Sequence, residues 1–321
     1  MTWFKEGYLI WANLFCTIAK IWMMIVGILS RRRALYSTRR LREELIKLGA
    51  DARVVDPLKC ILQLGPPRPA VYYNRRRLDG VEAIIPRVGI YGVPYILAVV
   101  RQFSNMGVPV VNSDEAIGCA RDKLRCLQRL AKAGIPIPDT FAAKYPSSFD
   151  KIVGLVGGPP VVLKLSSGSQ GTGVILSESI ESARSSLEAI WSLGADILIQ
   201  KFISESRGRD IRALVIDGEV RAAMRRVAGR NEFRSNIHRG GMGEPITLTG
   251  AYREVAARAA AAVGLKLAGV DILESSSGPL VIEVNASPGF QGLEVATGAN
   301  IAGMIAEYAI SQARRRRRVR A

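Results

Sequence analysis

The sequence has few residues that could act as nucleophiles, redox centres or soft metal ligands. Only four cysteines and one histidine occur among its 321 residues. Cys16, Cys60, Cys119 and Cys126 form no CxxC pair and lack zinc-ligand spacing, so we expect free thiols, as in a reducing cytoplasm. His238 lies outside any serine or cysteine nucleophile pattern, and a structural role in its loop is the better interpretation.

Acidic residues are the minority among the charged side chains. The chain has 45 Lys and Arg against 28 Asp and Glu, which gives a net charge of +17 and a pI near 10.2. This charge points to an acidic partner, such as nucleic acid, a nucleotide, an anionic surface or an acidic peptide. Aromatic residues make up 7% of the chain and are not interleaved with basic ones as on RNA-binding platforms. Direct nucleic-acid binding is therefore not favoured.

Residues 1–23 stand apart from the rest of the chain. Aromatic and aliphatic side chains recur there at helical spacing, namely Phe4, Tyr8, Trp11, Phe15, Ile18 and Trp22. The segment stops before an apolar strand at 24–30 and is too short to cross a bilayer, and no signal-peptide cleavage site follows it. We expect an extension that activity does not need, with Met23 or Met24 as the usual start. An interfacial helix is the alternative.

Strand-like and helix-like segments alternate between residues 24 and 112. The predicted strands are 24–30, 52–56, 81–89 and 108–112, and the predicted helices are 38–48 and 94–106. Leu41, Leu45 and Leu48 form the apolar face of the first helix. This alternation predicts a parallel, doubly wound α/β sheet. No GxGxxG follows the first strand, so a dinucleotide site there has no support.

Arginines cluster at two places. The first cluster follows the first strand and comprises Arg31, Arg32, Arg33, Arg39 and Arg40. It lies at the carboxyl edge of a parallel sheet, where ligands bind in open α/β folds, so it is either a solvated face or a site for an acidic substrate. The second run, Arg314 to Arg318, lies in a basic tail at 311–321. We expect that tail to be disordered and only to raise the local concentration of an acidic partner.

A strand lysine followed by glycines forms one chemical motif. The stretch from Val161 to Val174 reads VVLKLSSGSQGTGV, with Lys164 in a β-branched strand and a Ser- and Gly-rich loop at 166–173. Glycines let the backbone approach a ligand closely and point N–H groups at phosphate oxygens. No Lys-Ser or Lys-Thr pair follows the last glycine, which excludes a Walker loop. A flexible hairpin would explain the glycines alone, but the lysine favours a loop that covers phosphates.

A second motif brings two acids and an amide together. Two strand-like runs, 268–273 and 279–284, flank the turn residues Ser275 to Gly278. Folded as a hairpin about Ser277, this segment places Asp271 opposite Glu283, and period-two alternation puts Asn285 on the same face as Glu283. Three oxygen ligands then converge on a hard divalent cation, for which Mg²⁺ with bridging phosphates fits well. An exposed hairpin with solvated acids is the alternative, and the surrounding Val, Ile and Leu speak against it.

The run VDILESSSGPLVIEVNASPGFQGLE, residues 270–294, resembles the metal-binding end of ATP-grasp ligases, and more narrowly that of the RimK family. The resemblance extends from about Met24 to Tyr308. It implies an ATP-grasp fold preceded by a Rossmann-like pre-ATP-grasp domain. The implied borders are 24–112 for the first domain, 113–203 for the central lobe, and 204–310 for the C-terminal lobe with the metal site.

The resemblance also assigns roles to residues. Lys123, on a helix that Ser113 caps and Gly134 ends, would reach the phosphates, and the hinge strand ILIQKFI at 197–203 would hold the adenine through main-chain groups. The residues assigned to ATP are Lys123, Lys164, Lys201, Phe202, Asp210, Arg234, Ser235 and Asn236. The residues assigned to catalysis are Arg212, Arg234 and Asn236. Of these, Asp210 would bind the ribose hydroxyls and Arg212 would neutralise phosphate or carboxylate charge.

The implied function is ATP-dependent ligation of L-glutamate to the C-terminus of a small-subunit ribosomal protein through an acyl-phosphate, with single glutamates or a poly-glutamate tail as product. Two Mg²⁺ or Mn²⁺ ions are implied with ATP, and we expect a cytoplasmic homo-oligomer without stable membrane insertion. One alternative is an ATP-grasp ligase that glutamylates a cofactor or an amino-acid carrier protein. Another, of a different class, is a non-catalytic basic protein that associates with ribosomes or RNA.

Overall fold

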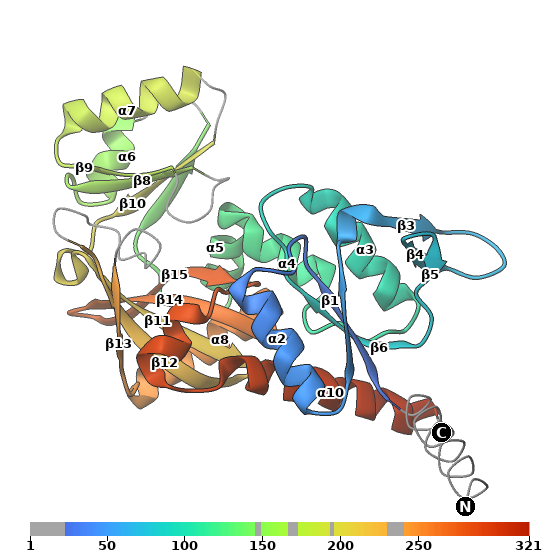
Figure 1. The fold of residues 1–321 in the computed structure, drawn as a ribbon. Coiled ribbons are helices and arrows are strands. Elements are labelled where there is room, and N and C mark those ends of the chain that lie inside the picture. Colours follow the sequence, from blue (N-terminus) through green and yellow to red (C-terminus); the bar gives the residue numbers. More distant parts are fainter. Residues whose placement is uncertain (1–22, 145–148, 166–172, 193–195, 230–240, 321) are drawn as a thin grey trace, which may run out of the picture. The chain divides into compact units, whose positions relative to one another are not determined.

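The computed structural model describes residues 23–144, 149–165, 173–192, 196–229 and 241–320 (Figure 1). The chain forms two compact units. The described residues up to Arg87, together with 102–111 and 302–320, form the first unit, and residues 88–101 and 112–301 belong to the second. The final helix therefore groups with the first unit, although its position in the sequence places it after the C-terminal lobe.

The first unit is built on a parallel sheet. Its middle strand is β1 (Ile25–Leu29), with β2 (Asp51–Val55) on one side and β6 (Val81–Pro86) on the other. The helix α2 (Tyr36–Lys47) buries Leu41 and Leu45 completely. These elements confirm the predicted parallel α/β arrangement. The inward position expected for Leu48 is wrong: α2 ends one residue earlier, and Leu48 is 41% exposed.

Two further parts of this unit differ from the sequence prediction. The expected strand at 108–112 is reduced to one parallel bridge between Ile84 and Val110. Between β2 and β6, a 3₁₀ turn (Pro57–Lys59) leads into a small antiparallel sheet that the sequence analysis does not predict. Its strands are β3 (Cys60–Gln63), β4 (Ala70–Tyr73) and β5 (Arg76–Arg77). The helix α3 (Val93–Asn105), whose residues up to Arg101 belong to the second unit, forms as predicted.

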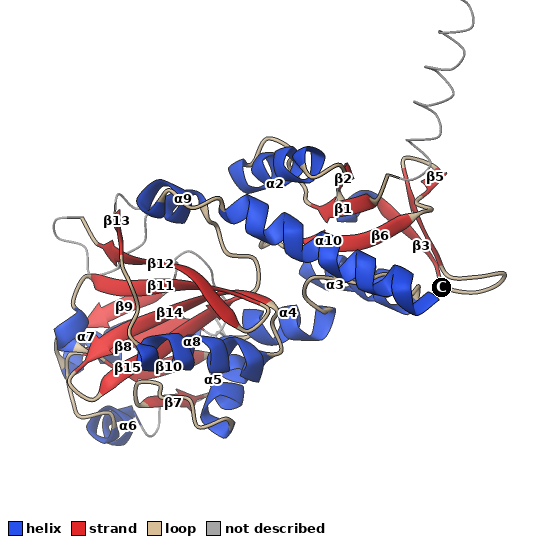
Figure 2. Cartoon of the chain, turned by 90° about the horizontal axis from the view of Figure 1, so that it is seen from below, coloured by secondary structure: helices blue, strands red, loops and turns tan. Residues whose placement is uncertain are grey.

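The last helix corrects the prediction of a disordered basic tail. Helix α10 (Ile301–Arg320) continues through the whole arginine run and lies alongside the parallel sheet (Figure 2). Its buried side chains recur every three or four residues, at Ala302, Ile305, Ala309 and Ala313, which is the period of a helix packed on one face. No helix within the described ranges is long and apolar enough to cross a membrane.

The second unit begins with two short helices and a small lobe. Helices α4 (Asp114–Arg121) and α5 (Lys123–Lys132) replace the single long helix of the prediction, because Asp122 leaves the helical conformation and caps α5. The following strands are β7 (Thr140–Ala143), β8 (Val161–Leu165), β9 (Val174–Ser177) and β10 (Ile197–Lys201), in the order β7-β10-β8-β9.

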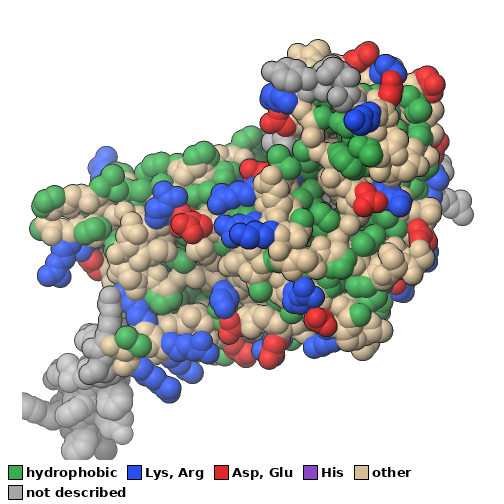
Figure 3. All heavy atoms as spheres, turned by 180° about the vertical axis from the view of Figure 1, so that it is seen from behind, with side chains coloured by type: hydrophobic (Ala, Val, Ile, Leu, Met, Phe, Trp, Pro, Cys, Tyr) green, Lys and Arg blue, Asp and Glu red, His purple; other side chains and the backbone are tan. Residues whose placement is uncertain are grey.

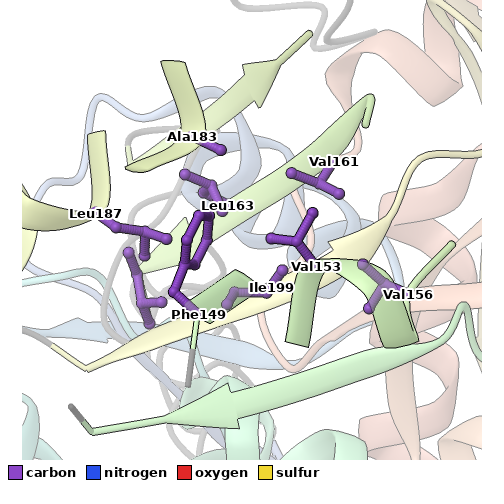
Figure 4. Packing of buried hydrophobic residues seen from close by; sticks show 9 residues of the cluster. Phe149, Val153, Val156, Val161, Leu163, Ala183, Leu187 and Ile199 are labelled. Carbon is purple, nitrogen blue, oxygen red and sulfur yellow. The ribbon is translucent and has the colours of Figure 1, made fainter. Parts of the chain in front are cut away.

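Helices α6 (Phe149–Leu155) and α7 (Ile180–Ser192) cover this four-stranded sheet (Figure 1). Figure 4 shows Phe149 and Val153 from α6 meeting Leu187 from α7 over Leu163 and Ile199 of the sheet. All five side chains are buried, so β8 and β10 are held from one face by an apolar core. The position of Lys164 within β8 is therefore fixed by its buried neighbours.

The larger sheet of the second unit is antiparallel, in the order β13-β12-β11-β14-β15. Its strands are β11 (Arg209–Ile216), β12 (Glu219–Val227), β13 (Met242–Pro245), β14 (Leu267–Ser275) and β15 (Gly278–Asn285). A 3₁₀ turn (Ser204–Ser206) precedes β11. The Ala-rich helix α8 (Gly250–Val263) packs across four of these strands, and α9 (Gln291–Thr297) contacts β12 and β13.

Candidate active site

The predicted hairpin carries the centre of the site. Strands β14 and β15 pair antiparallel with Asp271 directly opposite Glu283, and Ser275 opposite Gly278, so the register prediction is confirmed. Val270, Ile272 and Val284 are fully buried and alternate with the two acids along the strands, so they hold the hairpin in the sheet while the acids lie on its other face.

A buried asparagine holds the base of this hairpin together. The side-chain amide of Asn112 donates to the carbonyls of Leu267 (2.8 Å) and Ala286 (3.0 Å). Its oxygen accepts from the backbone N–H groups of Lys266 (2.9 Å) and Leu267 (3.0 Å). Asn112 thus joins the start of β14 to the end of β15 with all of its hydrogen-bonding capacity. The sequence analysis assigns it no role, because nothing in its local spacing points to a partner more than 150 residues away.

Asp271 belongs to a buried chain of ion pairs that runs from Asp210 through Arg226 and Asp271 to Arg212. Arg212 on β11 donates to both oxygens of Asp271, with Nη2 2.7 Å from Oδ2. Arg226 on β12 lies 3.0 Å from the same Oδ2, and it forms a bidentate pair with Asp210, in which both contacts are 2.6 Å. Asp210 and Arg212 share a sheet face, as their spacing predicts, and the network places both of them next to the hairpin.

Close backbone approach makes this network possible at Gly269. A Cβ atom there would lie 2.8 Å from the Cβ of Pro288 and 3.3 Å from the Cδ of Arg212. Any side chain at this position would therefore push Arg212 or Pro288 away. The glycine two residues before Asp271 lets Arg212 reach it from the neighbouring strand.

The two opposed acids have different electrostatic surroundings. Burial raises the pKa of Asp271, but the charges and hydrogen bonds of Arg212 and Arg226 outweigh this and leave it below the ordinary value. Burial, together with the negative charge of Asp271, raises the pKa of Glu283 above its ordinary value. Glu283 is therefore the carboxylate whose negative charge is less well compensated in the protein alone.

Two predicted lysines face the same place as Glu283. One small cavity is lined by Lys123, Lys164 and Glu283, together with other residues of the second unit that include Cys126 and Leu198. Burial lowers the pKa of Lys164 to about 8, with Lys123 adding to the effect and Glu283 opposing it. Burial also lowers the pKa of Lys123. The structure thus brings together a strand lysine, the first residue of α5 and Glu283 of the hairpin, as the sequence analysis predicts.

The residues of the hairpin fit a hard divalent cation. Their donors would be two carboxylates and an amide oxygen, which Mg²⁺ and Mn²⁺ prefer. The amide of Asn285 would bind the cation through its oxygen, while its Nδ2 atom, a donor, is buried without a hydrogen-bond partner. Within the described part of the chain, no three Asp, Glu, His or Cys side chains converge. The set is complete only with Asn285, and Asp271 would have to share or exchange its arginine contacts.

The remaining predicted site residues are distributed as follows. Lys201 ends β10, where its side chain is exposed and 3.7 Å from Asp139, and its backbone N–H donates to the carbonyl of Asp139. Phe202 comes next in the chain, with the guanidinium of Arg207 over its ring. Arg234, Ser235, Asn236, His238 and most of the loop at 166–173 lie outside the described residues, and so does most of the segment 1–23. The roles assigned to all of these residues stay predictions.

The sequence analysis did not identify Arg226, which pairs with both Asp210 and Asp271. The available signal was the pair Arg225–Arg226 in the run EVRAAMRRV, because period two places neighbouring strand residues on opposite faces. Arg225 reaches outward to Glu274, and both side chains are about one-third exposed. Arg226 is buried, at 6% exposure. The sequence of the run alone does not show which face of this strand is buried in the fold.

Comparisons with known proteins identify the family of the chain. Residues 24–117 match the RimK pre-ATP-grasp domain model, and residues 120–309 match the RimK-like ATP-grasp domain model. A probable alpha-L-glutamate ligase of Cellvibrio japonicus is 47% identical over 89% of this chain and 95% of its own length. One from Marinobacter nauticus is 48% identical with the same coverage.

Solved structures show the same fold. The ATP-grasp ligase PsnB complexed with a minimal precursor superposes with a TM-score of 0.74 at 23% identity, over 90% of this chain and 99% of that one. A RimK domain protein from Sphaerobacter thermophilus gives 0.69 at 25% identity, over 89% and 99%. With family models covering both units and relatives near half identity, this chain belongs to the RimK family of ATP-grasp ligases.

Proposed function

We propose that this protein uses ATP to ligate L-glutamate to the C-terminal carboxylate of an acceptor protein, and that the acceptor is a small-subunit ribosomal protein. The observation that carries the chemistry is the convergence of Lys123, Lys164 and Glu283 on one cavity beside Asp271. The names of the relatives, which are about 47% identical, support glutamate as the amine. The structure of PsnB with a precursor peptide supports a peptide as the other substrate.

The reaction proceeds in two steps. The acceptor carboxylate attacks the γ-phosphorus of ATP, and an acyl-phosphate and ADP form as the bond to the β-phosphate oxygen breaks. The amino nitrogen of glutamate then attacks the acyl carbon, phosphate leaves, the nitrogen loses a proton, and an amide forms. Neither step needs a protein nucleophile, so positioning and charge neutralisation remain as the tasks of the protein.

The residues of this chain divide those tasks. Lys123 and Lys164 hold phosphate oxygens, and Arg212 neutralises charge where the acceptor carboxylate meets the γ-phosphate. Asp271, Glu283 and Asn285 would hold a divalent cation, which would supply positive charge to neutralise the phosphates. Arg234 and Asn236, with Ser235, are assigned to the terminal phosphate. The number of bound ions, the homo-oligomeric state and the cytoplasmic location stay predictions.

The hairpin provides a matched pair of variants for the test. Glu283→Gln removes the buried acid at the site, whereas Glu274→Gln removes a half-exposed acid of the same hairpin that is paired with Arg225. We expect Glu283→Gln to abolish ADP release with glutamate and acceptor, and Mg²⁺-dependent ATP binding to weaken more than tenfold. Glu274→Gln should retain both. Normal turnover in a folded Glu283→Gln variant would refute the site.

Mass spectrometry decides the acceptor. Cell extract incubated with the protein, ATP and glutamate should yield a ribosomal protein that is heavier by one or more glutamyl residues. Modification of a small cofactor, or of an amino-acid carrier protein, would replace the proposed acceptor by the first alternative. No ATP turnover with any acceptor, together with binding to RNA, would favour the non-catalytic alternative.

A further inference from the structure

The arginine run at the end of α10 is fixed to the first unit by two of its members. Arg316 donates from Nη1 to the carbonyl of Val81 (3.3 Å) and from Nη2 to the carbonyl of Met106. Arg317 pairs with both carboxylate oxygens of Glu82, with Nη2 2.6 Å from Oε1. These contacts hold the last turns of α10 against β6 and the residues after α3, so the other arginines of the run are displayed on a fixed helix.

Those other arginines line a cavity. Arg314, Arg315 and Arg318 recur at the three- and four-residue spacing of a single helix face. They line a cavity of about 290 Å³ with Leu48, Glu307, Ile310 and Ser311. This volume is at the lower end of the range for ligand clefts, roughly 300–1,000 Å³. It is also far larger than the cavity lined by Lys123, Lys164 and Glu283.

Three arginines and one acid, Glu307, line the groove, so its net charge is positive. In the described part of the chain, Arg314, Arg315 and Arg318 form no ion pair with a carboxylate, and all three are exposed. Compensation of the helix dipole explains basic residues in the last turn only, whereas Arg314 lies more than one turn further in. Like charges at this spacing repel each other, so an anion in the groove would relieve the repulsion. In Figure 3, Lys and Arg side chains gather at the lower left, towards the end at which α10 finishes in Figure 1.

The lining also indicates the chemistry of the anion. Leu48 and Ile310 give the groove an apolar wall, and none of its lining residues is aromatic. A nucleic-acid strand would gain nothing from stacking there. Glutamate side chains suit the groove better, since their methylene groups can pack on the apolar wall while their carboxylates accept paired N–H bonds from guanidinium groups.

We propose that the groove formed by Arg314, Arg315 and Arg318 with Leu48 binds a glutamate-rich peptide segment, which is the acidic part of the acceptor or its growing glutamate tail. This inference deepens the proposed function and rests on it. It also replaces the expectation that the C-terminal arginines act only as a diffuse charge, because a helix anchored through Arg316 and Arg317 presents a defined surface.

Binding of a short fluorescein-labelled polyglutamate peptide, measured by fluorescence anisotropy at physiological salt, tests the groove without ATP or glutamate. The groove variant is Arg314→Gln, Arg315→Gln and Arg318→Gln in one chain. The control is Arg68→Gln, Arg75→Gln and Arg76→Gln, which removes three exposed arginines and the same charge elsewhere in the first unit. Each exposed pair contributes a few-fold at most, so we expect the groove variant to weaken binding about tenfold and the control less than about threefold.

Two further arms separate the alternatives. Leu48→Glu should also weaken peptide binding, since Leu48 is exposed at the groove and the change adds a repelling charge. A polyglutamine peptide should not bind. If the groove and control variants weaken peptide binding equally, only net charge acts. If replacing Arg31, Arg32 and Arg33 weakens peptide binding more than the groove variant does, the acceptor binds at that other arginine cluster. Tighter, groove-dependent binding of an RNA oligonucleotide would assign the groove to RNA instead.

The outcome is separate from that of the proposed function. If the groove variant binds polyglutamate normally while ADP release with glutamate and acceptor is intact, the groove assignment is refuted and the ligase assignment stands. If the wild-type chain binds polyglutamate through the groove but releases no ADP, the ligase assignment fails alone. In steady-state kinetics the groove variant should raise the acceptor KM and leave the ATP KM unchanged.

Discussion

Arg225 and Arg226 give the sharpest test of how the site is held together. The two residues are neighbours on β12 and face opposite sides of the sheet. Arg226 is buried and bridges Asp210 and Asp271, whereas Arg225 is part-exposed and bridges only to Glu274. Replacing either by Met keeps much of the side-chain volume and removes the charge. We expect Arg226→Met to destabilise the fold strongly and Arg225→Met hardly at all.

The expected magnitudes follow from burial. Removing one partner of a buried ion network leaves uncompensated charge and costs about 3–5 kcal/mol, whereas an exposed pair contributes about 0–1 kcal/mol. The Arg226→Met substitution removes both 2.6 Å contacts to Asp210, whereas Asp271 keeps its contact with Arg212. For a unit of this size the larger loss corresponds to a decrease in Tm of at least about 6 °C.

Urea unfolding followed by far-ultraviolet circular dichroism measures both variants. Adding Asp210→Asn to Arg226→Met should recover part of the lost free energy of unfolding, because it removes the charge left without a partner. A role of Arg226 in packing alone predicts no such recovery. The reasoning is refuted if the two single variants differ by less than about 1 kcal/mol, or if the Arg226→Met variant is as stable as the wild type.

Three further predictions concern single groups. Burial lowers the pKa of Lys164 to about 8, so its side chain loses the positive charge as the pH rises through that value. The ATP affinity measured by calorimetry should therefore fall between about pH 7 and 9. The Lys164→Arg variant stays charged over this range, so its ATP affinity should not change with pH. Asn112→Ala should lower the free energy of unfolding by about 1–3 kcal/mol for each buried backbone group left unpaired at the hairpin base, and a change in Tm below about 2 °C would contradict this. Burial raises the pKa of Cys60 and of Cys126 to about 12, so both thiols should react with a disulfide reagent far more slowly in the native protein than in urea, and rapid native reaction would show that they are exposed.

The parts of the site that the sequence predicts are those set by local spacing. Asp271 and Glu283 lie in two strands joined by a two-residue turn, so period-two alternation and the turn residues fix their register. Lys164 is predicted for a similar reason, because its strand and the following glycines are adjacent in the chain. Its proximity to Lys123 is not local, and the resemblance to the RimK family supplied it.

Features that depend on distant partners were not predicted from spacing. Arg226 reaches Asp210 only because β12 pairs with β11 in one register, and Asn112 meets Leu267 only in the folded lobe. The helix break at Asp122 was missed because an aspartate inside a helical pattern can be either a surface residue or a cap. The arginine run was read as a tail by composition, which cannot show that Glu82 and two carbonyl groups would bind part of it.

The arrangement of charges gives the opposed acids unequal roles. Arg212 and Arg226 already neutralise Asp271, which is why its pKa is lowered, while the pKa of Glu283 is raised. A divalent cation would therefore gain most from Glu283, and its approach would weaken the hold of Arg212 on Asp271 because two positive charges would compete for the same oxygens. In the metal-free protein Arg212 pairs with the buried carboxylate of Asp271, so Arg212→Met should lower both the free energy of unfolding and the turnover with glutamate and acceptor.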